Sequence, residues 1–210
     1  MNKYLTEGIG TFFLTLSVVI LNGKNNATDA AFAVGGTLLA LTYAFGPVSG
    51  AHFNPAISIA MLIRGKIERL DLPYYLLAQV VGAVLASLMA SFLVRCAGVT
   101  EMPLRHIDPI CALVAEFMGA FLLSSVFLQV NSSRASAGNP YFGLAIGMAL
   151  LAGMLIFGNL SGGIFNPAVA ISLCMTGLGD WGDYWAYLIG GLLGASAAAS
   201  VYRVIQGEQD

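Results

Sequence analysis

Charge is scarce in this chain. Charged residues make up 10% of the 210 residues, and nine basic against eleven acidic side chains leave a net charge of −2, whereas about a quarter of an ordinary soluble domain is charged. No stretch gathers lysine and arginine into a basic stripe, so we expect no nucleic-acid partner. The three cysteines lack the spacing of a metal site or of a disulfide framework, and we expect no metal and no cofactor.

Apolar residues take the place of charge. Hydrophobic residues form 58% of the chain, and the mean hydropathy is +0.81. A helix needs ~20 apolar residues to cross a hydrocarbon layer of ~30 Å, and six windows approach that length. We therefore predict an all-α polytopic protein of the lipid bilayer with six transmembrane helices, near residues 8–22, 30–48, 74–95, 110–130, 141–158 and 184–204.

Two further apolar stretches are too short to cross. They cover Asn54 to Arg64 and Asn166 to Thr176, and at 1.5 Å per residue each reaches only ~16 Å. We expect two re-entrant half-helices.

The chain also contains an internal repeat. SGAHFNPAISI at 49–59 returns as SGGIFNPAVAI at 161–171, an offset of 112 residues, and Glu7-x-x-Gly10 returns as Glu116-x-x-Gly119. The halves are about 1–95 and 110–204, joined by a linker at 96–109 in a single domain of residues 1–210. Three spans in each half make the repeat inverted, with a pseudo-two-fold axis at the bilayer midplane.

Each repeated motif contains an Asn-Pro-Ala triplet at the start of a half-helix. Proline suits the first helical position, and the unpaired backbone N–H groups there carry the positive end of the helix dipole. Two such ends that face each other predict a pore with a positive centre. The six residues are Asn54, Pro55, Ala56, Asn166, Pro167 and Ala168.

Glu7 and Glu116 are acids deep within predicted spans. An intramembrane acid can be a proton relay, but a carboxylate can also accept the backbone N–H groups of a re-entrant loop where water is absent. We prefer this supporting role, because each half has one acid and one loop. His52 either faces the pore or fixes its loop by hydrogen bonds, and we favour the second role, since Ile164 replaces it in the other copy.

Small residues and basic residues complete the prediction. Glycine and alanine recur at helical spacing, as at Gly82 and Ala86 or at Gly190 and Gly194, which predicts close helix packing.

With the N-terminus inside, six basic residues lie inside and three outside, as the positive-inside rule expects. We predict a multi-pass plasma membrane protein with cytoplasmic N- and C-termini.

The chain resembles the aquaporin (major intrinsic protein) family in two features. It has two Asn-Pro-Ala motifs, each preceded by Ser-Gly-x-x-Phe, and it has Glu-x-x-Gly near the start of each half. The resemblance covers Glu7 to Tyr202. It implies a homotetramer in which each protomer is a passive channel for water and small neutral solutes, with no enzyme activity. It also implies that Asn54 and Asn166 point amide N–H groups into the pore and that protons and ions are excluded.

The chain departs from the family at the outer constriction. Gap-free alignment places this ring at Val34, Met154, Gly163 and Val169, where Val169 replaces the usual arginine. Losing a guanidinium removes five N–H donors, so an alternative cargo is ammonia, hydrogen peroxide, dissolved gases or small polyols in preference to water. Ala170 stands where the glycerol-conducting branch usually has aspartate.

Three other classes of protein compete with the channel. A secondary transporter would share the inverted repeat, but coupling-ion ligands are not evident in the sequence. An enzyme is disfavoured because no nucleophile lies beside a base in any recognisable motif. A non-conducting scaffold or junction protein with a closed pore is the main alternative, and the short stretch from Gly207 to Asp210 argues against the long tail such a protein would use.

Overall fold

The computed structural model describes residues 2–22, 26–98 and 107–206. In these ranges the regular structure is entirely helical, and six of the helices are long and apolar enough to cross a membrane. The prediction of an all-α, six-span protein is therefore confirmed. The elements are α1 (Asn2–Asn22), α2 (Ala27–Ser49), α3 (Pro55–Ile63), α4 (Leu72–Cys96), α5 (Pro109–Ser132), η1 (Arg134–Ser136), α6 (Phe142–Ser161), α7 (Pro167–Thr176), η2 (Trp181–Asp183) and α8 (Tyr184–Gln206).

α1, α2, α4 and α5 begin one to six residues before the predicted apolar windows, whereas α6 begins one residue later and α8 begins at the predicted residue. α2 starts after Asn26, whose side chain accepts the Asp29 N–H. α5 starts after Asp108, whose carboxylate accepts the Cys111 N–H at 2.8 Å. This backbone hydrogen bond lowers the pKa of Asp108. The carboxylate therefore stays charged and interacts favourably with the positive end of the helix dipole. Hydropathy windows omit such polar caps, although the caps fix where the helix begins.

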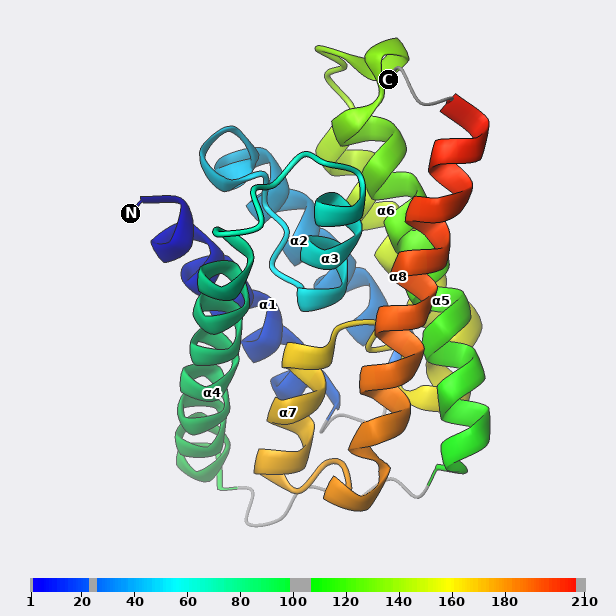
Figure 1. Cartoon of the computed structure of the whole chain (residues 1–210). Helices are drawn as coiled ribbons and strands as arrows, with labels where there is room; N and C mark the ends of the chain where they lie inside the picture. Colours follow the sequence, from blue (N-terminus) through cyan, green and yellow to red (C-terminus); the bar gives the residue numbers. More distant parts are fainter. Residues whose placement is uncertain (1, 23–25, 99–106, 207–210) are drawn as a thin grey trace.

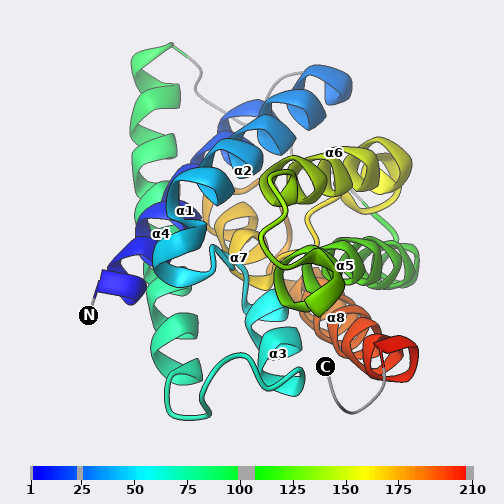
Figure 2. The same cartoon turned by 90° about the horizontal axis from the view of Figure 1, so that it is seen from above.

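The two halves of the sequence form two sides of one bundle. Figure 2 shows α1, α2 and α4 on one side, α5, α6 and α8 on the other, and the half-helices α3 and α7 between them. α1 and α5 run in opposite directions (Figure 1), as an inverted repeat requires. Each half-helix packs against the other half: α3 contacts α8 and α5, and α7 contacts α4.

Glycines allow the helices to approach closely. A methyl group added at Gly82 would lie 2.3 Å from the Gly8 carbonyl oxygen, and one at Gly194 would lie 2.3 Å from that of Phe117. α2 and α6 cross at Gly35 and Gly147, where the added methyl carbons would lie 2.9 and 2.7 Å from the carbonyl oxygen of the opposite glycine. The helix backbones are therefore in direct contact at these crossings.

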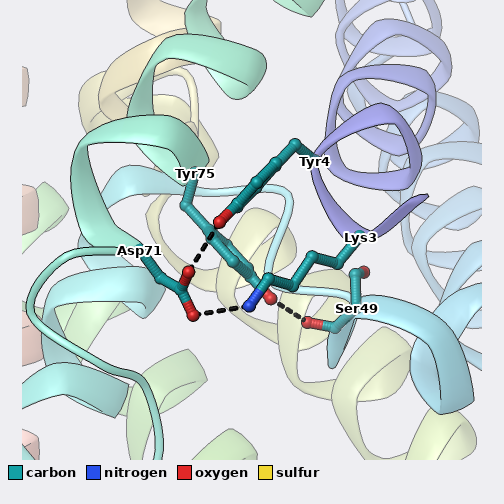
Figure 3. A network of polar contacts seen from close by, with 5 residues as sticks. All are labelled: Lys3, Tyr4, Ser49, Asp71 and Tyr75. Carbon is teal, nitrogen blue, oxygen red and sulfur yellow. Dashed lines mark hydrogen bonds and ion pairs between the residues drawn. The ribbon is translucent and has the colours of Figure 1, made fainter. Parts of the chain in front are cut away.

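Polar contacts join three segments at the face where α1 begins and α8 ends, called here the terminal face (Figures 1 and 3). At the start of α4, Asp71 accepts hydrogen bonds from Lys3 Nζ at 2.5 Å and from the Tyr4 hydroxyl at 2.6 Å. The bond from Lys3, followed by that from Tyr4, lowers the pKa of Asp71. One turn on, Tyr75 donates to the Ser49 carbonyl at 2.7 Å. The starts of α1 and α4 thus hold the end of α2, where the first re-entrant loop begins.

Part of the predicted linker and two of the basic residues used for orientation lie outside the described residues. These are positions 99–106, which include Arg105, and Lys24.

Gly194→Ala tests the close crossing of α8 and α5. The added methyl group meets backbone rather than a movable side chain, so we expect a loss of about 1–3 kcal/mol in stability. Thermal unfolding of the purified protein in detergent measures it. Gly36→Ala is the matched control, because a methyl group there meets nothing within 4 Å; an equal effect of the two changes would contradict the packing argument.

Candidate functional site

The half-helices α3 and α7 meet end to end at the middle of the bundle (Figure 1). Each begins with proline, and the asparagine before it caps the helix with its side chain. Asn54 Oδ1 accepts the Ala56 N–H at 2.8 Å, and Asn166 Oδ1 accepts the Ala168 N–H at 3.1 Å. Both positive helix ends therefore converge on one point.

Each asparagine also bonds to the opposite loop. Asn54 Nδ2 donates to the Phe165 carbonyl at 2.8 Å, and Asn166 Nδ2 donates to the Phe53 carbonyl at 2.9 Å. A side-chain amide carries two N–H donors, so this bond uses one and leaves the second for a molecule in the adjoining cavity. The sequence did not predict this reciprocal pair of bonds.

The two phenylalanines that provide these carbonyls have unusual backbones. Phe53 has φ of 49° and Phe165 has φ of 50°, a region that bulky residues rarely occupy and that costs of order 1–3 kcal/mol. Their rings fill the space above Gly10 and Gly119, where an added methyl group would lie 2.0 Å from the ring. Glycine in Glu-x-x-Gly thus makes room for the loop that glutamate binds.

Glu7 accepts four hydrogen bonds from the first loop and its surroundings. Oε1 accepts the Ser49 hydroxyl at 2.6 Å and the His52 N–H at 3.0 Å. Oε2 accepts the Phe53 N–H at 2.6 Å and Gln79 Nε2 at 2.8 Å. The carboxylate therefore satisfies backbone donors of a loop that has no helix of its own.

Glu116 repeats this arrangement in the second half with one bond fewer. It accepts the Ser161 hydroxyl at 2.6 Å, the Ile164 N–H at 3.0 Å and the Phe165 N–H at 2.6 Å. Gly191 occupies the position of Gln79 in the repeat and offers no side-chain donor. The two loops share their backbone support but differ in their side-chain networks.

His52 belongs to the richer network. Its Nδ1 lies 3.1 Å from the Ser58 hydroxyl, which accepts Gln79 Nε2 at 2.9 Å. Its ring packs against Tyr75 and Phe127 at centroid distances of 5.0 and 5.7 Å. The imidazole is therefore fixed, and it also lines the central cavity.

The central cavity is lined by both half-helices and is almost entirely apolar. His52, Asn54 and Asn166 are the polar residues in its described lining. The others are Leu14, Val18, Val34, Leu38, Ala51, Ile57, Leu123, Phe127, Ile146, Leu150, Gly163, Ile164 and Val169.

Three of the four residues aligned with the outer constriction line this cavity, namely Val34, Gly163 and Val169. Met154 is 8% exposed and is not part of the lining. Its Cα would lie 3.0 Å from a methyl group at Gly163, so its backbone lies behind the loop. Sequence reasoning also missed Ile57 and Ile146 in the lining, although shifting Val169 and Val34 by the repeat offset finds both.

Cys174 lies away from the central cavity. It lines a separate pocket beside Leu173, Asp180 and Tyr187, and its Sγ lies 3.5 Å from the Asp180 carbonyl oxygen. Across the described ranges, His, Cys, Asp and Glu form no group of three that could hold a metal ion.

Comparison with known proteins agrees with this geometry. The family model described as "Major intrinsic protein" matches residues 1–202. Glycerol uptake facilitator protein-like 6 of Lactiplantibacillus plantarum is 37% identical over 99% of this chain and all of its own length. Aquaporin NIP1-1 of Zea mays is 32% identical over 98% of this chain and 75% of its own.

The X-ray structure of the aquaglyceroporin from Plasmodium falciparum has the same fold. It superimposes with a TM-score of 0.82 over 96% of this chain and 94% of its own, at 21% sequence identity. The family model, the two relatives and the paired half-helices lead to one conclusion: the chain belongs to the major intrinsic protein family, whose members are membrane channels for water and small solutes rather than enzymes.

Proposed function

We propose that residues 1–210 form one channel domain and that solutes cross through the central cavity by passive diffusion. The observation that carries this proposal is the convergence of two half-helix N-termini and two asparagine amides on one apolar cavity. Each amide retains one N–H after its bond to the opposite loop. A neutral molecule with a lone pair can accept a hydrogen bond from each of these N–H groups in turn. Its passage needs no conformational cycle of the protein.

The same centre excludes cations and protons. Each helix end is equivalent to roughly half a positive charge, and the apolar walls give an ion no substitute for its lost hydration. A water molecule that accepts hydrogen bonds from the side-chain amides of both Asn54 and Asn166 points its own hydrogens away from the centre. The chain of hydrogen-bonded waters is then interrupted for proton transfer.

Selection among neutral solutes occurs, in this proposal, at constrictions without arginine. Val34, Gly163 and Val169, with Met154 behind them, form the outer constriction and provide no charge and no side-chain donor. Water loses hydrogen bonds there and regains only those to backbone carbonyls. Less strongly hydrated molecules, such as ammonia and dissolved gases, lose less and pass more readily relative to water, and hydrogen peroxide is a further candidate cargo.

Glu7, Glu116 and His52 support the loops in this proposal and do not relay protons. Each carboxylate accepts hydrogen bonds from loop donors, and the His52 Nδ1 faces Ser58.

We further propose a homotetramer in the plasma membrane with both termini cytoplasmic, so that the terminal face is the inner face.

Stopped-flow permeability of purified protein in liposomes tests the function. Water, glycerol, ammonia and hydrogen peroxide are compared in one preparation, and glycerol is included because a relative is named a glycerol uptake facilitator. We expect flux above that of bare lipid for water or for the less polar solutes. No flux for any of the four would favour the scaffold reading.

Asn166→Asp tests the pore centre. The change replaces the Nδ2 donor by an oxygen facing the Phe53 carbonyl, which removes a buried hydrogen bond and costs about 1–3 kcal/mol of folding stability. The new carboxylate also holds cations at the point where two helix dipoles converge. We expect solute flux to fall in the protein that still assembles; unchanged flux and unchanged proton exclusion would place Asn166 outside the pore.

Val169→Arg tests the outer constriction. The longer side chain adds donors that water can use and fills space beside Val34 and Gly163. We expect the ratio of water flux to ammonia or hydrogen peroxide flux to rise. If the variant assembles normally and this ratio does not rise, Val169 does not lie at the constriction.

A further inference from the structure

The internal repeat gives the cavity a second ring of apolar residues. The valine ring consists of Val34, Gly163 and Val169. Shifting these positions by 112 residues within the repeat gives Ile146, Ala51 and Ile57, called here the isoleucine ring. All six residues line the central cavity.

The two rings lie on opposite sides of the asparagine pair. Val169 is the third residue of α7 and Ile57 the third residue of α3, and these helices run away from each other. Val34 and Ile146 adjoin the glycines at which α2 and α6 cross, and side chains tilt toward the N-terminus of their own helix. They therefore tilt apart, with Ile146 directed toward the terminal face.

The fourth position is withdrawn in both rings. Met154 is its residue on the valine side, and Thr42 occupies the equivalent place on the isoleucine side. Neither lines the cavity, and Thr42 is fully buried. Each ring is thus formed by two β-branched side chains and one loop residue.

The isoleucine ring is the bulkier of the two. Each isoleucine has one methylene more than the matching valine, and Ala51 has a methyl group that Gly163 lacks. β-Branched side chains have one strongly preferred χ1 rotamer in a helix. Ile57 and Ile146 are 2% and 1% exposed, so their neighbours pack closely around them on the sides that face away from the cavity.

We propose that the isoleucine ring, on the terminal side of the asparagine pair, sets the size limit of this channel. The inference rests on the proposed function and adds the location and the substrate class. Molecules the size of water, ammonia or hydrogen peroxide pass this ring, and three-carbon polyols are held back there. The valine ring has fewer carbon atoms, and it selects among solutes by their polarity rather than by their size.

The imidazole of His52 adds a polar group next to this ring. It follows Ala51 in the chain, lines the same cavity and is held by Ser58. The matching residue beside the valine ring is Ile164. A small solute can therefore exchange a hydrogen bond near the isoleucine ring that the valine ring does not offer.

Widening each ring in turn tests the inference. Ala51→Gly suits the loop, because Ala51 has φ of 52°, which glycine adopts without strain, and it is combined with Ile57→Val. Ile59→Val is the matched control, since Ile59 lies on the same half-helix but does not line the cavity. Val169→Ala widens the valine ring for comparison. Glycerol and water permeabilities are measured in liposomes with equal amounts of folded protein.

We expect Ala51→Gly with Ile57→Val to raise the ratio of glycerol to water permeability about tenfold, as one methylene in a tight apolar site can discriminate. Ile59→Val should keep the parent ratio, and Val169→Ala should change it less than the isoleucine-ring variant. The inference is overturned if Val169→Ala has the larger effect or if the parent already conducts glycerol in preference to water. A parent with no flux of any solute would instead refute the proposed function, so the two failures are distinguishable.

Discussion

The structure depends on two buried carboxylates that bind the backbone of two loops. A chain that enters a membrane and turns back exposes N–H groups where no water can accept them, and each unpaired group is costly. Glu7 and Glu116 accept those N–H groups next to phenylalanines with positive φ. This support lets both half-helices begin at the middle of the bundle, where their capping asparagines line the cavity.

Much of this architecture could be read from the sequence, because its main signals are local. Hydropathy gave the six spans, the length of the apolar stretches gave the half-helices, and the repeat of Asn-Pro-Ala gave their pairing. The reciprocal bonds between each asparagine and the opposite phenylalanine carbonyl could not be predicted. They join residues more than a hundred positions apart, and they depend on a backbone conformation that phenylalanine seldom adopts.

The outer constriction shows the limit of reasoning by alignment. Counting along the chain placed Met154 in the ring with Val34 and Val169. The count gives the position on the helix but not the direction of a long flexible side chain, and in the structure Met154 lies behind Gly163. Conversely, Ile57 and Ile146 carry no motif of their own. Only the combination of the repeat with the cavity lining brings them together.

The two halves are equivalent in backbone and unequal in side chains. Where the first half has His52, Ser58 and Gln79 in one hydrogen-bonded network, the second has Ile164, Ala170 and Gly191. Both loops share an asparagine that caps the half-helix and a carboxylate that binds the loop backbone. These side-chain differences lie beside the two approaches to the centre, which can therefore treat a solute differently.

The crossed bonds between the asparagines and the phenylalanine carbonyls also bear on how the molecule is made. α3 packs against α4 of its own half and against α5 and α8 of the second half, and Asn54 donates to the Phe165 carbonyl. A newly synthesised first half therefore holds a re-entrant segment that is supported by Glu7 and Gln79 but lacks its partners in the second half. The contacts of α3 with α8 and of Asn54 with Phe165 can form only after the second half has been made.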